Sequence, residues 1–274
     1  MTPPPPVGAS SVVLHSGAAT HRGLKRPANE DAYLAASPVF LVADGMGGHE
    51  AGERASAIVV ESFDGLTGRP TVAPIDVRAA FDRAYRSISE LSSGGKRRAG
   101  TTVSGVAVVE SDGVALWLVF NLGDSRTYRL NGDSLEQISI DHSVVQELLD
   151  GGGIDIAAAA VHPARNVITR ALGAGGDYRP DFWLVPIEEG DRMFICSDGV
   201  SGEVDTETIA RILSVEKDPQ MAADHLVREG MARGGHDNLT AVVVDARLSE
   251  TEQDTAMPDD TIPRGNAPIT GVAR

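Results

Sequence analysis

The clearest pattern in the sequence is a set of short apolar runs, each closed by glycine, aspartate or asparagine. The runs are rich in β-branched residues, which is typical of strands bounded by turns. The predicted strands are 39–43, 101–109, 114–121, 125–130, 192–196 and 239–245. Ser111-Asp112-Gly113 and Asn131-Gly132-Asp133 lie at hairpin distance between consecutive strands. We therefore expect those neighbours to pair antiparallel.

Helical periodicity lies before and after this group of strands. Residues 75–91 place Val77, Phe81, Ala84, Ile88 and Leu91 on one face, and 50–63 is a second helix. Two more are predicted at 206–213 and 220–232. Because strands are grouped and do not alternate with helices, the pattern favours a layered α+β domain over a doubly wound parallel sheet.

The segment 142–172 breaks this regularity. It opens with a predicted helix at 142–149 and continues through three glycines and an alanine run. A long, weakly patterned insertion is typical of a functional loop or flap, with surface decoration as the alternative. We expect one domain over 11–247, with flexible tails at 1–10 and 248–274, where proline and small polar residues dominate.

Charge and composition narrow the class of protein. The chain has 274 residues, 24 Lys and Arg against 39 Asp and Glu, and a net charge of −15. An acidic chain with 4% aromatic residues is a poor binder of nucleic acid or anionic membranes. One cysteine, no long apolar stretch and no signal-peptide pattern favour a cytoplasmic protein. A monomer is the default expectation.

Aspartates next to glycine or asparagine lie at the ends of several predicted strands. They occur in Val42-Ala43-Asp44-Gly45, Leu122-Gly123-Asp124-Ser125, Cys196-Ser197-Asp198-Gly199 and His236-Asp237-Asn238. Any one of them alone is more typical of a turn than of a ligand. Repetition at the ends of strands predicts converging carboxylates, whose like charges raise one another's pKa unless a cation compensates. Oxygen-only ligands select a hard ion, Mg²⁺ or Mn²⁺.

Better-known phosphate sites do not fit. The glycine-rich stretch after Asp44 lacks the dinucleotide fingerprint, and no P-loop motif occurs. A cysteine phosphatase needs arginine six residues after its nucleophile, where this chain has Gly202 after Cys196. An aspartyl-phosphate mechanism needs a second aspartate two residues on, where Met46 follows Asp44.

Taken together, the motifs resemble the bacterial form of the PP2C family of metal-dependent Ser/Thr protein phosphatases. The resemblance rests on the order and separation of Arg26-Pro27-Ala28-Asn29-Glu30-Asp31, Asp44-Gly45-Met46-Gly47-Gly48, Gly100-Thr101-Thr102, Asn121-Leu122-Gly123-Asp124, Ser197-Asp198-Gly199 and Asp237-Asn238-Leu239-Thr240. It implies an α-β-β-α sandwich of two antiparallel sheets flanked by helix pairs. The flap of bacterial members falls at 142–172.

The resemblance also implies a role for each matching residue. Asp44 would bridge two ions and the Gly45 carbonyl would bind one of them. Asp198 and Asp237 would complete the second ion's ligands, and Asp124 would join Asp198 at a weaker third site. Glu30 would act through a bound water. Arg26 would bind the substrate phosphate, which makes Arg26, Asp44, Asp198 and Asp237 the predicted catalytic set.

The implied reaction is hydrolysis of phosphoserine and phosphothreonine on proteins by a metal-activated water, opposing a bacterial Ser/Thr kinase and acting on its targets. Some members have histidine where Met46 stands, so the general acid is open, with a metal-bound water as our candidate. The main alternative is a regulatory binding module that uses the fold without catalysis. A metal-dependent nuclease conflicts with the acidic charge.

Overall fold

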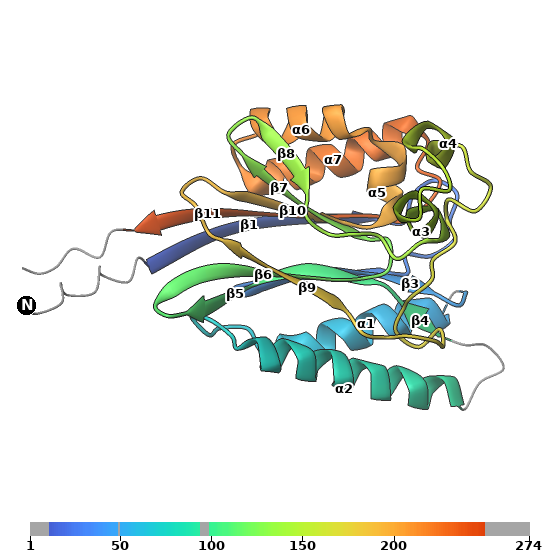
Figure 1. Cartoon of the computed structure of the whole chain (residues 1–274), viewed down its shortest axis with the longest axis horizontal. Helices are drawn as coiled ribbons and strands as arrows, with labels where there is room; N and C mark the ends of the chain where they lie inside the picture. The colour runs from blue at the N-terminus through green and yellow to red at the C-terminus, as the bar shows by residue number, and fades with distance from the viewer. Residues whose placement is uncertain (1–10, 49, 94–98, 250–274) are drawn as a thin grey trace, which may run out of the picture.

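The chain folds into two antiparallel sheets packed face to face between two layers of helices (Figure 1). The structure is a computed structural model that describes residues 11–48, 50–93 and 99–249. The predicted tails at 1–10 and beyond 249 lie outside the described residues. The last strand runs to Ser249, two residues past the domain end expected at 247.

Sheet A contains five strands and sheet B six. In order across sheet A these are β1 (Ser11–His21), β11 (Leu239–Ser249), β10 (Arg192–Cys196), β7 (Arg126–Asn131) and β8 (Ser134–Gln137). Sheet B runs β2 (Asp31–Ala36), β3 (Val39–Met46), β5 (Val103–Ser111), β6 (Val114–Leu122) and β9 (Asp181–Pro186), with β4 (Gly100–Thr101) paired to β3. Strands β1 and β11 pair over their whole length, so both ends of the described chain lie together.

The outer layers are helix pairs. Helices α1 (Glu50–Asp64) and α2 (Pro74–Ser93) cover sheet B. Helices α6 (Thr206–Val215) and α7 (Pro219–Arg233) cover sheet A, after the short α5 (Asp198–Glu203). The layer order visible in Figure 1 is the α-β-β-α sandwich that the resemblance implied.

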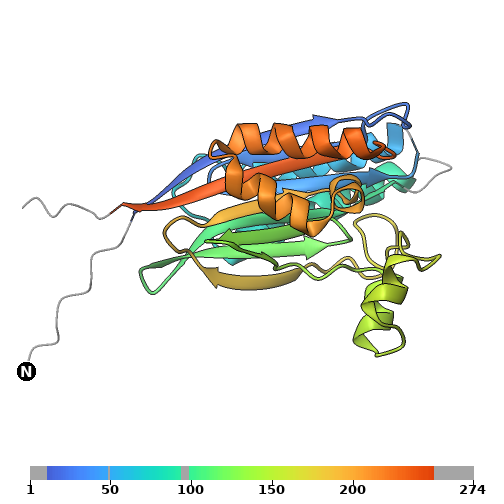
Figure 2. The ribbon, with the colours of Figure 1, turned by 90° about the horizontal axis from the view of Figure 1, so that it is seen from above.

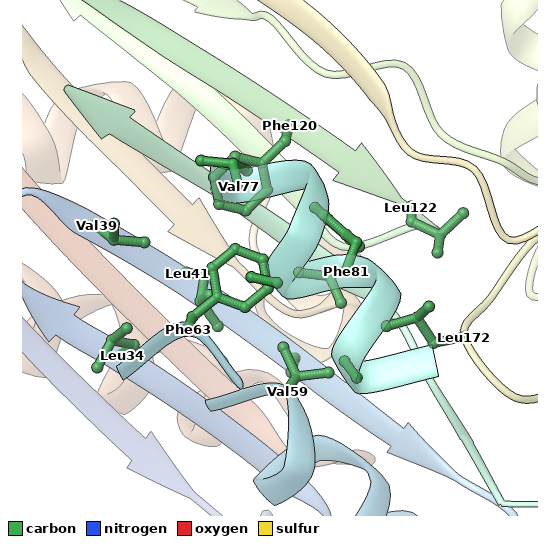
Figure 3. Packing of buried hydrophobic residues seen from close by; sticks show 14 of the residues in the cluster. Leu34, Val39, Leu41, Val59, Phe63, Val77, Phe81, Phe120, Leu122 and Leu172 are labelled. Atoms are coloured by element: carbon green, nitrogen blue, oxygen red, sulfur yellow. The ribbon is translucent and has the colours of Figure 1, made fainter. Parts of the chain in front are cut away.

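Three apolar cores hold these layers together, one at each junction. Between the sheets lie Phe40, Trp117, Met193 and Val242. Between sheet B and its helices, the rings of Phe63, Phe81 and Phe120 meet with centroids 5.3–5.6 Å apart (Figure 3). Phe81 meets the other two rings edge to face, whereas Phe63 and Phe120 stack, and contacts of both kinds add to the free energy of burying the rings.

Both predicted hairpins are confirmed, through the pairs Ser111 with Val114 and Asn131 with Ser134. The predicted strand 101–109 is broken at Thr102, which separates β4 from β5. The list of predicted strands missed β1, β2, β8 and β9, of which the turn at 131–133 had indicated only β8. Their small or half-exposed residues weaken the alternation that marks a strand, and β1 forms only by pairing with a strand more than 200 residues away.

The flap leaves the sandwich at one end and carries α3 (Val144–Asp150) and α4 (Ile156–Ala160), as Figure 2 shows. Helix α3 begins two residues later than predicted because Ser143 caps it by accepting a hydrogen bond from the Gln146 amide. An isolated antiparallel β-bridge between Ser143 and Ile168 closes the base of the flap. Among the described residues, no helix combines the length and apolar character needed to cross a bilayer.

Replacing Phe81 by alanine tests the core beneath sheet B. The ring is 1% exposed, so Phe81→Ala should lower the free energy of unfolding by about 3–5 kcal/mol. Ile75→Ala on the same helix is the control, because Ile75 is 68% exposed and its loss should cost under about 0.5 kcal/mol. Urea unfolding followed by circular dichroism measures both, and equal losses would contradict this packing.

Candidate active site

One cavity of about 320 Å³ gathers every site residue expected from the sequence. It lies at the end of the sandwich that carries the flap. Its walls include all seven predicted residues: Arg26, Glu30, Asp44, Gly45, Asp124, Asp198 and Asp237. Thr102, Asn238 and the flap residues Asn166 and Ile168 also contribute. The strand ends therefore converge as the repeated aspartates indicated.

Asp44 is held by its backbone near the end of β3. Its N–H donates to the Thr102 hydroxyl at 3.1 Å, and its carbonyl accepts from the Thr102 N–H at 2.9 Å and the Thr101 hydroxyl at 3.0 Å. The break between β4 and β5 makes these contacts possible, because it turns both threonines toward β3. Three hydrogen bonds with these two threonines thus hold the backbone that directs the carboxylate.

Asp198 and Asp237 come from different elements that pack closely. Asp198 is the first residue of α5, and Asp237 lies in the loop before β11. Gly199 permits the approach, since a Cβ there would stand 1.9 Å from the Asn238 carbonyl oxygen. Any larger residue at Gly199 would push these two segments apart.

Asn238 joins the two ends of the chain beneath the cavity. Its side-chain oxygen accepts from the Glu30 N–H at 2.8 Å, and its amide donates to the carbonyls of Arg22 and Ala28, each at 2.9 Å. The segment that carries Arg26 is therefore tied to the loop that carries Asp237. The sequence motif included Asn238 without assigning it this task.

Arg26 reaches the cavity and forms an ion pair with Asp237, with 2.6 Å between Nη2 and Oδ2. Partial burial lowers the pKa of Arg26, but the hydrogen bond and charge of Asp237 together raise it by more, so the net shift is upward. The arginine side chain remains 52% exposed. It is thus fully charged and open to a ligand from solvent.

Arg126 lies two residues after Asp124, but its guanidinium binds groups outside the acidic cavity. Its guanidinium binds the Asp141 carboxylate through Nε at 3.0 Å and Nη2 at 2.7 Å, and it also donates to the Tyr128 hydroxyl. Because this carboxylate and hydroxyl occupy its guanidinium, we assign Arg126 a structural role.

The carboxylates raise one another's pKa, as the sequence predicted for converging charges. Burial, then the charges of neighbouring aspartates, raise the pKa of Asp44 well above its ordinary value. Burial and then Asp198 raise the pKa of Asp124 to about 8. Burial and then Asp237 raise the pKa of Asp198, against a hydrogen bond with Asp44 that lowers it. Without added positive charge, these groups share protons.

Asp31 is a buried acid that sequence reasoning left without a role. It pairs with Asp44 across β2 and β3, and its Oδ2 accepts hydrogen bonds from the hydroxyls of Ser197 at 2.8 Å and Thr240 at 2.7 Å. Burial raises its pKa to about 7, partly offset by those bonds. The signal available in the sequence was its place directly after Glu30 in the Asn29-Glu30-Asp31 motif.

The donor set fits hard divalent cations. All the candidate ligands are oxygens, and the buried Asp198 Oδ1 has no hydrogen-bond partner within the described chain. Gly52 makes room for the Glu30 carboxylate, because a Cβ there would stand 1.9 Å from Glu30 Oε2. No three acidic, histidine or cysteine side chains of residues 11–48, 50–93 and 99–249 form a ready-made metal cluster. The carboxylates face one cavity without closing around a point.

A larger cavity of about 480 Å³ lies elsewhere, beside Arg192 and Asp245. Arg192 is already bound to Asp245 and to the carbonyls at the end of α6. Its buried charge therefore stabilises the helix end and is not available for chemistry. We assign the functional site to the smaller cavity for this reason.

Comparisons with known proteins agree with this assignment. Residues 20–232 match the family model of protein phosphatase 2C. The serine/threonine phosphatase Stp of Listeria innocua is 32% identical over 89% of this chain and all of its own length. The crystal structure of the Ser-Thr phosphatase MsPP of Mycobacterium smegmatis, in complex with cacodylate, is 36% identical with a TM-score of 0.76, covering 84% of this chain and 97% of its own.

The catalytic domain of the phosphatase PstP, solved with two manganese ions, is 32% identical with a TM-score of 0.77. The match covers 86% of this chain and 99% of that one. The family and the sandwich architecture expected from the motifs are both confirmed.

The shifted carboxyls predict how stability depends on pH when divalent ions are chelated. Asp31 and Asp124 have pKa values of about 7 and about 8 in the folded chain, against about 4 when unfolded. The folded state therefore holds protons that the unfolded state has released, so the free energy of unfolding should fall as pH rises from about 4 to about 8.

Calorimetry in chelator at about pH 5.5 and about pH 8 measures this trend, and Asp124→Asn should reduce it. Stabilisation by added Mn²⁺ should grow with pH, because the cation replaces those protons. An unfolding temperature that rises with pH in chelator would contradict the assigned shifts.

Proposed function

The chain belongs to the protein phosphatase 2C family of metal-dependent serine/threonine protein phosphatases, and we propose that the cavity at the flap end is where it hydrolyses phosphoserine and phosphothreonine. The observation that carries this proposal is the convergence of four aspartates and Arg26 on one cavity. Their order along the chain is that of the family motif.

We assign metal binding to the acidic wall. Asp44 would bridge two ions, with the Gly45 carbonyl on one and Asp198 and Asp237 on the other. Glu30 would hold a water beside them, and Asp124 with Asp198 would form a weaker third site. When bound, divalent cations supply a hydroxide nucleophile at neutral pH and neutralise charge on the phosphoryl oxygens. Mn²⁺ is favoured by the PstP structure, and Mg²⁺ fits the same ligands.

Arg26 would bind the substrate phosphate. A planar guanidinium can donate two parallel hydrogen bonds to phosphoryl oxygens, and it keeps its charge at every working pH. Its place beside Asp237 and its exposure support this role. Met46 also borders the cavity and cannot donate a proton, so the leaving serine or threonine oxygen would take its proton from water.

The substrates are phosphorylated proteins, and we propose that they are targets of a bacterial Ser/Thr kinase whose action this enzyme reverses. We further propose that the enzyme acts in the cytoplasm and as a monomer. Chemistry favours an enzyme over a binding module that has lost activity. Such a module has no need of the full acidic set, whereas Asp44, Asp198 and Asp237 all face the cavity here. A nuclease would need a basic path for its substrate, and the net charge is −15.

Asp44→Asn should lower kcat for p-nitrophenyl phosphate by at least about a hundred-fold with saturating Mn²⁺, because it removes the negative charge between the proposed ions. EDTA should abolish the activity of the parent enzyme. Asp64→Asn, at the end of α1 on the outer layer, is the control and should remain fully active. Normal turnover by Asp44→Asn would remove the proposed bridging role.

Arg26→Ala should raise KM for a phosphothreonine peptide by about 10–100-fold with a smaller change in kcat, because it removes charged hydrogen bonds to the phosphate. Arg26→Lys should recover part of the loss, since lysine keeps the charge without the fork. Arg54→Ala on α1 is the control. Steady-state kinetics decide the matter, and an unchanged KM would show that Arg26 is structural.

A further inference from the structure

His142 lies at the base of the flap and contacts three separate segments. Its side chain is 5% exposed. Its N–H donates to the Gly123 carbonyl and its own carbonyl accepts from Thr169, each at 2.8 Å. Its ring contacts the Gly123 N–H at 3.1 Å and Asp181 Oδ2 at 3.0 Å. One residue thus joins the Asp124 turn, the end of the flap and the start of β9.

The contacts determine which ring nitrogen carries the proton. A peptide N–H can only donate, so Nδ1, which faces the Gly123 N–H, must be the acceptor. The proton therefore lies on Nε2 and points at the Asp181 carboxylate. Arg170 lies 3.3 Å from both Nε2 and Asp181 Oδ1, and because it too is a donor, its partner is the carboxylate.

The two bonds to Gly123 bear directly on Asp124, the next residue. Gly123 has a φ of 111° and no space for a side chain, since a Cβ would stand 2.6 Å from Thr102. Its carbonyl also accepts from the Asn121 amide at 3.0 Å. His142 holds both the N–H and the carbonyl of this residue, so it determines how the peptide before Asp124 is turned.

The same residue also sets the flap wall. The Val144 N–H donates to the Val167 carbonyl at 2.9 Å, next to the bond between His142 and Thr169. Ile168, between those paired residues, borders the cavity together with Asn166. A shift of His142 would move the flap wall and the Asp124 carboxylate together.

We propose that His142 is a positioning residue that directs the Asp124 carboxylate into the cavity through Gly123, and fixes the flap wall to it. This rests on the proposed function, in which Asp124 binds the weakest ion. A neutral ring with its proton on Nε2 performs the task, and it touches neither substrate nor ion.

Two half-mimics of histidine separate its two side-chain contacts. The asparagine side-chain oxygen can take the place of Nδ1, whereas the glutamine amide nitrogen reaches the place of Nε2. His142→Asn should keep the bond to Gly123, and His142→Gln only the bond to Asp181. Calorimetric titration of the chelator-treated protein with MnCl₂ is the assay. His142→Ala and His142→Gln should weaken the weakest binding step about ten-fold, and His142→Asn should bind like the parent protein.

His225→Ala is the matched control, because His225 pairs with Glu216 on the outer helix layer and should leave Mn²⁺ binding unchanged. Asp124→Asn tests the route. If His142 acts through Asp124, then adding His142→Ala to Asp124→Asn should cause no further loss of Mn²⁺ binding. Additive losses, or a His142→Asn protein as weak as His142→Ala, would overturn the proposal.

A measurement on the parent protein covers the case in which His142→Ala fails to fold. Nitrogen-15 NMR of the metal-free protein should show a neutral His142 ring with its proton on Nε2 and a coupling between Nδ1 and the Gly123 amide. A proton on Nδ1 would refute the assignment. Neither this spectrum nor the binding titration depends on turnover. Absence of Mn²⁺-dependent phosphatase activity in the parent protein would instead refute the proposed function.

Discussion

The structure depends on holding several buried acidic side chains close together at one end of a sandwich that is otherwise built around three apolar cores. Asp31, Asp44, Asp124 and Asp198 are all shifted toward the protonated form by burial and by one another. Such a cluster opposes folding unless protons or cations neutralise it. The free energy gained by burying the three apolar cores offsets the cost of this cluster.

Buried hydroxyl groups keep the two sheets in register beside that cluster. The Thr102 and Ser125 hydroxyls lie 2.7 Å apart, and those of Ser104 and Thr127 lie 2.9 Å apart, each pair linking the β5 side to the β7 side. Ser197 reaches across in the same way to Asp31. Because these bonds are short and directional, the sheets cannot slide without breaking them, and the aspartates keep their relative positions.

The flap is connected to this rigid end by polar bonds at its base. Its wall residues Asn166 and Ile168 share the cavity with Asp124 and Arg26, so a substrate bound through its phosphate would contact the flap as well. The acidic side chains of the cavity come from the strand ends and their loops, whereas Asn166 and Ile168 of the flap form another part of its wall.

The sequence by itself determined the layered α+β class, both hairpins, the four long helices and the family, because apolar periodicity and short motifs are local. It also named the residues that meet at the cavity, whose individual roles stay predictions. The tertiary structure alone decided the pairing of β1 with β11, the role of Asn238 in joining its loop to Glu30, and the burial of Asp31. Those contacts join residues about 200 positions apart, where no local pattern indicates the partner. His142 was predicted as the start of a helix, because its four bonds to Gly123, Thr169 and Asp181 form only once the sheets and the flap have come together.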